Sequence, residues 1–120
     1  MNAVFDTKRD SMATMILNPF LVKTFVLMMS SQFNTRAAQH IEGTIQFYFS
    51  GEVDGSCYCI IEDGIVEPKM GVAEKVDLIL GGPYSLWRDI LSGEADVYQM
   101  LIKGRIQALG NMSLMQIFVR

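Results

Sequence analysis

The residues with the clearest chemical potential are two cysteines that stand two positions apart. Cys57 and Cys59 lie in a segment with the alternating pattern of a β-strand, so their side chains are expected on one face of a sheet. At that spacing their Cα atoms are too far apart for an easy disulfide bridge. A Cys-x-Cys pair could ligate a metal, but there is no second cysteine pair and the one histidine is His40. We interpret both as small apolar side chains and expect no metal and no cofactor.

The other reactive residue types form no catalytic pattern. His40 lies in the polar segment that follows a predicted helix, and no motif supplies a nucleophile beside it. Gly81-Gly82-Pro83 precedes a helix but lacks the pattern of a phosphate-binding loop, and Pro83 has no N–H to donate. Several acidic residues lie beside turns and are typical of solvated caps: Glu62, Asp63, Glu94 and Asp96. The sequence therefore predicts a protein that is not an enzyme.

Composition indicates one apolar domain over residues 1–120, with residues 1–10 polar and frayed. Half of the residues are hydrophobic and 19% are charged, and the net charge of −3 argues against a nucleic-acid partner. No uncharged window reaches the roughly 20 residues that span a bilayer, so we expect no transmembrane segment. No cleavable signal pattern opens the chain, which predicts a cytoplasmic location.

The first half of the chain predicts helices followed by three antiparallel strands. Helices are expected over residues 11–17 and from Asn18-Pro19 onward, the second with an apolar stripe at Val22, Phe25, Val26, Met29 and Phe33. The strands are expected over residues 43–51, 56–61 and 65–67, with turns at residues 52–55 and 63–64. Pro68 cannot donate to a ladder, so the third strand should lie at an edge or end there.

The second half predicts strand, helix, helix, strand and helix. The expected ranges are residues 76–80, 84–91, 97–102, 105–109 and 112–118, with Gly81-Gly82-Pro83 breaking the first of these strands. Together the elements indicate an α+β fold with helices on one face of a twisted, mixed and mostly antiparallel five-stranded sheet. Alternation assigns Ile45, Phe47, Phe49, Ile106 and Ala108 to the covered face. It assigns Tyr48, Cys57, Cys59, Ile61, Ile79 and Leu109 to the opposite one.

Apolar residues exceed what a small core requires. Nine methionines supply flexible side chains that fill irregular space, whether as core filler or as the lining of an adaptable cavity. Residues 112–119 are apolar nearly all round, which predicts a helix buried between the sheet and either a ligand or a partner.

Residues 93–112 carry a recognisable sequence pattern. A glycine after a helix is followed by a short helix, Lys103-Gly104-Arg105, an alternating strand, Gly110-Asn111 and a methionine-containing helix. This pattern resembles the closing signature of the sterol carrier protein 2 (SCP2) domain, in a stand-alone member of bacterial or archaeal type. Val76-Asp77-Leu78-Ile79-Leu80 is similar to the family's aspartate-marked fourth strand. The resemblance covers residues 20–118 and implies an apolar tunnel that holds fatty acyl chains, sterols or similar lipids.

Two functions follow, and the sequence leaves both open. The first is non-catalytic binding and transfer of a long apolar lipid, with transient membrane contact. The second is an interaction or accessory domain, as a homodimer through the outer sheet face or docked to a partner, for example in isoprenoid-quinone synthesis. The helix residues expected to bind a ligand, each of which would otherwise be plain core, are Phe25, Met29, Trp87, Ile90, Leu91, Leu101, Met112, Met115 and Phe118.

Overall fold

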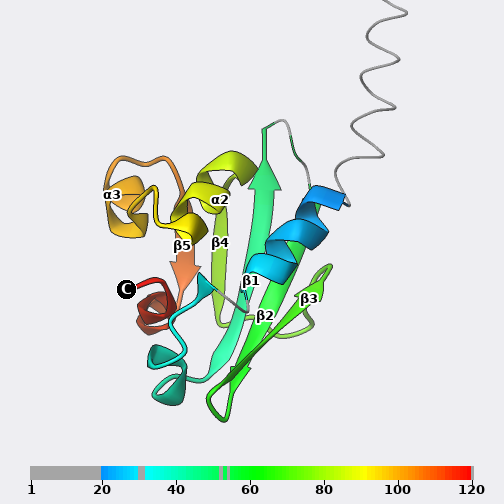
Figure 1. Ribbon diagram of the computed structural model, residues 1–120, viewed down its shortest axis with the longest axis vertical. Helices are drawn as coiled ribbons and strands as arrows, with labels where there is room; N and C mark the ends of the chain where they lie inside the picture. Colours follow the sequence, from blue (N-terminus) through cyan, green and yellow to red (C-terminus); the bar gives the residue numbers. More distant parts are fainter. Residues whose placement is uncertain (1–19, 30–31, 52, 54, 120) are drawn as a thin grey trace, which may run out of the picture.

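A five-stranded sheet forms the centre of the computed structural model, which describes residues 20–29, 32–51, 53 and 55–119 (Figure 1). The spatial order of the strands is β3-β2-β1-β4-β5. Their bounds are β1 Gly43–Ser50, β2 Gly55–Glu62, β3 Ile65–Met70, β4 Leu78–Pro83 and β5 Gln107–Gly110. The helical elements are a helix over residues 20–29, η1 Ala37–Gln39, α2 Tyr84–Ser92, α3 Val97–Ile102 and η2 Met112–Phe118. The predicted helix over residues 11–17 and the predicted cap Asn18-Pro19 lie outside the described residues, whereas the helix expected after that cap is present over residues 20–29.

The strands pair as a mixed sheet, which confirms the predicted α+β class. β1, β2 and β3 form an antiparallel meander, β4 runs parallel to β1, and β5 pairs antiparallel with β4. Asp63 and Gly64 join β2 to β3 with φ angles of 53° and 76°, as a two-residue hairpin turn requires. Pro68 pairs with Cys59 inside the edge strand β3. The edge position is therefore as predicted, while the strand continues past Pro68 to Met70.

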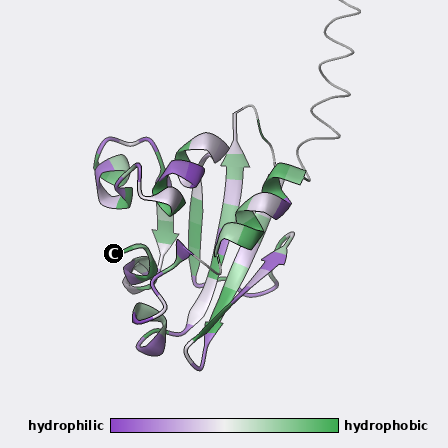
Figure 2. Cartoon of the chain, viewed as in Figure 1, coloured by the Kyte–Doolittle hydropathy of each residue, from purple (hydrophilic) through white to green (hydrophobic). Residues whose placement is uncertain are grey.

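One face of the sheet carries the core and is covered by helices. Phe25, from the helix over residues 20–29, packs edge-on against Phe47 and Phe49 with ring centroids 5.3 and 4.9 Å away. Trp87 of α2 meets Phe47 with its ring centroid 5.5 Å away. Figure 2 shows hydrophobic residues both in the strands and in the helix that covers them. The predicted apolar stripe therefore faces the sheet, with Met29 among its buried members.

The register of β2 corrects the predicted assignment of Cys57, Cys59 and Ile61 to the outer face. Cys57 lies opposite Phe47 and Cys59 opposite Ile45, and residues directly opposite in a pair share a face. All three side chains are buried. Three residues do lie on the outer face as predicted, namely Tyr48, Ile79 and Leu109. Ile106 and Ala108 are on the covered side, because Ala108 pairs with Leu80 and Ile106 is buried.

The connection from β3 to β4 is held across the outer face by a buried glutamine. Gln46 Nε2 donates to the carbonyl oxygens of Cys57 and Gly71, each at 3.0 Å, and its Oε1 accepts the N–H of Ala73 at 2.9 Å. Among the described residues, Gln46 is the only polar or charged residue that is buried. Its amide therefore replaces water for a loop that must pass over β2 and β1.

β4 continues through the glycines that were predicted to break it. Gly81 and Gly82 pair with Tyr48 and Phe49, and Pro83 ends the strand as the N-cap of α2 in an extended conformation. A Cβ atom on Gly82 would lie 3.0 Å from Ile106 Cγ2 and 3.2 Å from Trp87 Nε1. Glycine here thus allows α2 to pack closely on the sheet, and it does not act as a strand terminator.

The final segment is a 3-10 helix with one buried side. Leu114, Met115 and Ile117 are buried, whereas Met112 and Gln116 are exposed. In the chain alone this helix is therefore buried on the side that faces the core, and burial of its exposed side by a ligand or a partner stays a prediction. Within the described residues, no helix has the length and apolarity needed to cross a membrane.

Candidate functional site

A cavity of about 490 Å³ lies where the end of α2, the start of α3 and the end of η2 meet. Its buried lining residues are Ile90 and Val97, and Phe118 is half-buried. Exposed residues complete the lining at its solvent side: Gly93, Glu94, Asp96, Tyr98 and Val119. This volume is within the range of small-molecule sites. The hollow is partly open to solvent, and its lining combines apolar side chains with polar ones.

Helix caps shape the bend between α2 and α3 that forms one wall. Gly93 ends α2 with a left-handed φ of 86°, and its N–H donates to the carbonyl oxygen of Ile90 at 3.2 Å. Asp96 begins α3, where its Oδ1 accepts the N–H groups of Tyr98 and Gln99 at 2.8 and 3.1 Å. One Asp96 oxygen is therefore committed to the cap, and the bend is fixed at both ends.

Asn34 positions the C-terminal wall of the cavity. Its backbone N–H donates to the carbonyl oxygen of Ile117 at 2.9 Å, and its Nδ2 donates to that of Val119 at 2.5 Å. Its Oδ1 also accepts the N–H groups of Arg36 and Ala37 at the start of η1. The end of η2, including Phe118, is thus tied to a segment more than eighty positions earlier in the chain.

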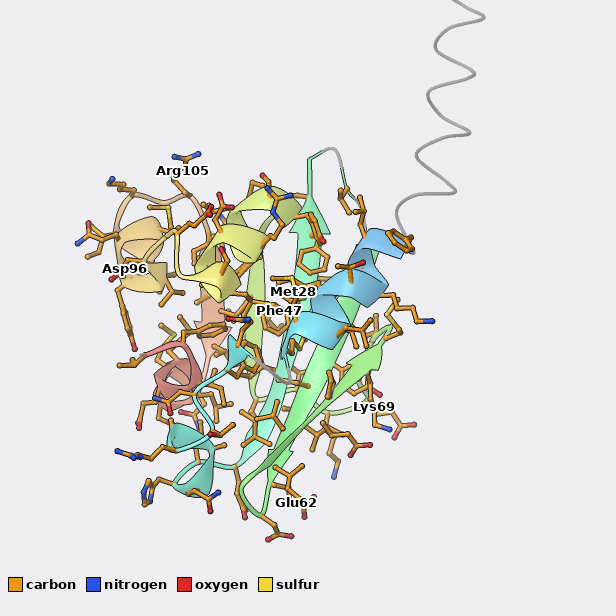
Figure 3. All side chains as sticks on the ribbon, in the orientation of Figure 1. Met28, Phe47, Glu62, Lys69, Asp96 and Arg105 are labelled. Atoms are coloured by element: carbon orange, nitrogen blue, oxygen red, sulfur yellow. The ribbon has the colours of Figure 1, made fainter. Side chains whose placement is uncertain are left out.

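Phe118 connects the cavity to an aromatic cluster on the sheet. Its ring centroid lies 5.2 Å from that of Phe33, 5.8 Å from that of Trp87 and 6.3 Å from that of Phe47. Trp87 is fully buried, and its Nε1 has no hydrogen-bond partner among the described residues. Figure 3 shows Phe47 at the centre of the molecule beneath the helix that carries Met28. Phe118 therefore joins the cavity lining to the aromatic cluster of the core.

The predicted site residues occupy three different environments. Ile90 and Phe118 line the cavity, and Trp87 packs directly behind Phe118. Leu101 is half-buried on α3 and Met112 is exposed at the start of η2. The remaining four lie buried in the core, away from the cavity lining: Phe25, Met29, Leu91 and Met115. Sequence reasoning missed the lining residues Val97, Tyr98 and Val119, although the Asp96 cap signal marks the bend that places the first two there.

The described residues offer little reactive chemistry at or near this cavity. Burial raises the pKa of Cys59 to about 12 and raises that of Cys57 as well, with the neighbouring Cys59 thiol as a second cause for Cys57. Both thiols are therefore protonated at neutral pH and poor nucleophiles. Within the described residues, no group of three His, Cys, Asp or Glu side chains is arranged to hold a metal ion.

No family model and no curated protein matches the chain. Solved structures do match it, including a sterol carrier protein domain 2 of Helicoverpa armigera with a TM-score of 0.64 and 18% identity. That match covers 79% of this chain and 80% of the other. The fold is that of sterol carrier protein 2.

Two further matches place the SCP2 fold in different protein contexts. A UbiJ-SCP2 ubiquinone synthesis protein matches with a TM-score of 0.57 and 18% identity, over 96% of this chain and 93% of that protein. The sec-alkylsulfatase Pisa1 from Pseudomonas sp. matches with a TM-score of 0.64 and 15% identity over 75% of this chain. The matched region is 14% of the sulfatase, so the fold is shared with one part of a much longer enzyme.

Proposed function

We propose that this chain binds and transfers a long apolar lipid without catalysis, in the cytoplasm. The observation that supports it is the cavity of about 490 Å³ whose inner ring, Phe118, is also a member of the aromatic cluster on the sheet. On this proposal, a ligand that displaces this ring opens an apolar tunnel between the helices and the covered sheet face. The ligand class comprises fatty acids, fatty acyl groups, and sterol-like or isoprenoid-like lipids.

Apolar burial alone provides enough free energy for such binding. Each methylene removed from water contributes about 0.8 kcal/mol, so a chain of a dozen carbons gains on the order of 10 kcal/mol before the entropic cost of association. Two partly buried residues of α3, Met100 and Leu101, pack against the core. The methionine side chain is flexible and can adapt to ligands of different shape. Low selectivity among chains of similar length is therefore expected.

The test is a titration with a homologous series of unbranched lipids between about 8 and 18 carbons. Affinity should rise with each methylene, until the chain exceeds the space available. Native mass spectrometry of the purified protein should show one lipid per chain. Affinity independent of chain length, together with a lipid-free protein, would show that the chain is not a lipid carrier.

The outer sheet face favours a second candidate, an interaction or accessory domain. Tyr48, Ile79 and Leu109 are exposed there, and Leu109 is 73% exposed. Exposed apolar groups on one sheet face are typical of contact surfaces, and a UbiJ-SCP2 ubiquinone synthesis protein shares the fold. In this alternative the chain forms a homodimer or docks to a partner, as in isoprenoid-quinone synthesis. It predicts a lipid-free dimer in native mass spectrometry, and Leu109→Lys should convert that dimer to a monomer.

A further inference from the structure

α3 leaves apolar side chains exposed on the molecular surface. Val97 is the one residue of this six-residue helix that is buried. Tyr98 and Ile102 lie one turn apart on the same side of the helix, and Ile102 is 79% exposed. A helix that serves only the core would place its isoleucine inward. This side of α3 therefore presents an exposed apolar surface.

Two cations follow the exposed isoleucine. Lys103 and Arg105 are both exposed, and among the described residues neither has a carboxylate within ion-pair distance. By contrast, Lys69 on β3 pairs with Glu67 at 3.2 Å. Arg105 points outward from the α3 end of the molecule in Figure 3, far from Lys69. These two cations form a locally basic surface on a chain of net charge −3, and such a surface favours an anionic partner.

The nearby acids lie at the other end of α3. Glu94 and Asp96 precede the helix, and Asp96 is engaged as its N-cap. Six helical residues span about 9 Å, close to one Debye length at physiological salt. The two acids at the Tyr98 end of the helix therefore lie about one screening length from the two cations, which can approach an anionic surface.

We propose that Tyr98, Ile102, Lys103 and Arg105, here called the α3 tip, dock on the surface of a membrane that contains anionic lipids. The isoleucine and the tyrosine ring enter the interface, and the two cations meet the head groups. A surface this small binds weakly and reversibly, which suits a transient contact. Tyr98 also lines the cavity, so the docked surface adjoins the cavity opening. This inference stands apart from the proposed lipid carriage, because it depends on the surface of α3 and not on an occupied cavity.

The test measures co-sedimentation of the full chain with phosphatidylcholine vesicles, with and without about one third phosphatidylglycerol. The wild-type chain should bind the anionic vesicles more strongly, and added salt should weaken binding. The double substitution Lys103→Glu with Arg105→Glu should reduce the partition coefficient about 25-fold or more, since each cation near an anionic surface contributes a factor of about five. Ile102→Ser should reduce it about fivefold.

β3, at the far edge of the sheet, provides matched controls. Ile65 is 66% exposed, so Ile65→Ser removes a comparable isoleucine, and Lys69→Glu reverses one charge. Both controls should bind nearly as well as the wild type. Equal losses in tip and control variants, or equal binding to neutral and anionic vesicles, would overturn the proposal. So would a tip variant that turns a dimer into a monomer while the wild type ignores vesicles, because the tip would then be a contact between copies.

Discussion

The rings of Trp87 and Phe118 pack against each other with centroids 5.8 Å apart and an angle of 41° between their planes. Trp87 comes from α2 and Phe118 from the end of η2, so the contact joins the cavity wall to the helix that rests on the sheet. Phe118 is half-buried and Trp87 fully buried, so Phe118 is the member of the pair that a ligand in the cavity reaches first.

Ligand binding should therefore change the emission of Trp87, the one tryptophan in the chain. Phe118→Ala should weaken lipid binding several-fold, because it removes apolar contact area between the cavity and the cluster. Fluorescence titration with a single unbranched lipid measures both effects. Phe20→Ala is the matched control, since Phe20 is 65% exposed and lies outside the cavity lining. Unchanged affinity in the Phe118 variant would place the ligand elsewhere.

The charge at the opening predicts a preference among head groups. Glu94 and Asp96 line the cavity at its solvent side, and the described lining includes no Lys or Arg. An anionic head group at the opening should bind two- to fivefold more weakly than an uncharged one of equal chain length, since like charges a few ångströms apart repel even in water. Competition between a fatty acid and the corresponding alcohol measures this ratio. Glu94→Gln should bring the two affinities closer together, whereas Glu62→Gln, on the far hairpin, should leave their ratio unchanged.

The connection from β3 to β4 should depend on Gln46 for its stability. Gln46→Leu leaves the Gly71 carbonyl and the Ala73 N–H without their present partner, which should cost about 1–3 kcal/mol of unfolding free energy. Urea unfolding measures the loss. Gln107→Leu is the control, because Gln107 is exposed and makes one long hydrogen bond of 3.4 Å to Gly104. Similar stability of the two variants would show that water replaces the Gln46 amide at little cost.

Gly110 occupies a position that a side chain cannot share. Its φ is 127°, and a Cβ atom there would lie 3.0 Å from the Cα atom of Leu78 and still closer to the Asp77 carbonyl group. Gly110→Ala should therefore destabilise the fold by more than 2 kcal/mol, because backbone on the neighbouring strand would have to move. Gly71→Ala isolates this clash, since Gly71 also has a positive φ of 91° but open space around it. Its cost should stay near 1 kcal/mol.

The buried thiols predict a loss of stability in alkaline solution. The pKa of Cys59 rises from an ordinary value of 9.0 to about 12 in the folded chain, because burial disfavours the thiolate. Between those values the unfolded chain releases the proton and the folded chain keeps it, so the unfolding free energy should fall as pH rises above 9. The slope from this thiol is about 1.4 kcal/mol per pH unit. Urea unfolding at several pH values measures it, and Cys59→Ala should make the decline shallower.

Periodicity along the sequence was sufficient to predict most elements, because helix and strand patterns are local. The stripe through Val22, Phe25 and Met29 faces the sheet, and α2 and α3 have nearly the expected bounds. The pairing register between strands, by contrast, depends on residues that are not neighbours in the sequence. Alternation within β2 identifies the face shared by Cys57, Cys59 and Ile61, but their position relative to Phe47 depends on the hairpin register, which the sequence pattern leaves undetermined. An Ile61→Lys substitution would thus bury a charge in the core instead of altering the surface.

The candidate site was harder to predict than the fold. Apolar helix residues such as Met29 and Ile90 look alike in sequence, yet Met29 is buried away from the lining and Ile90 lines the cavity. The difference arises where α2, α3 and η2 meet, and this geometry depends on the Asp96 cap and the Asn34 hydrogen bonds together. The burial of Gln46 could not be predicted either, because a glutamine at a strand position normally faces solvent.

The parallel pairing of β1 with β4 has a consequence for the order of folding. β1 meets β2 through a short hairpin, but it meets β4 across the chain, as the hydrogen bond from Thr44 to Asp77, 33 residues apart, shows. Closing a long loop costs entropy before its contacts form, so the β1-β2-β3 meander should assemble first and β4 and β5 should join it later. Until then one edge of β1 lacks its neighbouring strand, and a nascent chain that has not reached Trp87 covers Phe47 only with rings that precede it, Phe25 and Phe33.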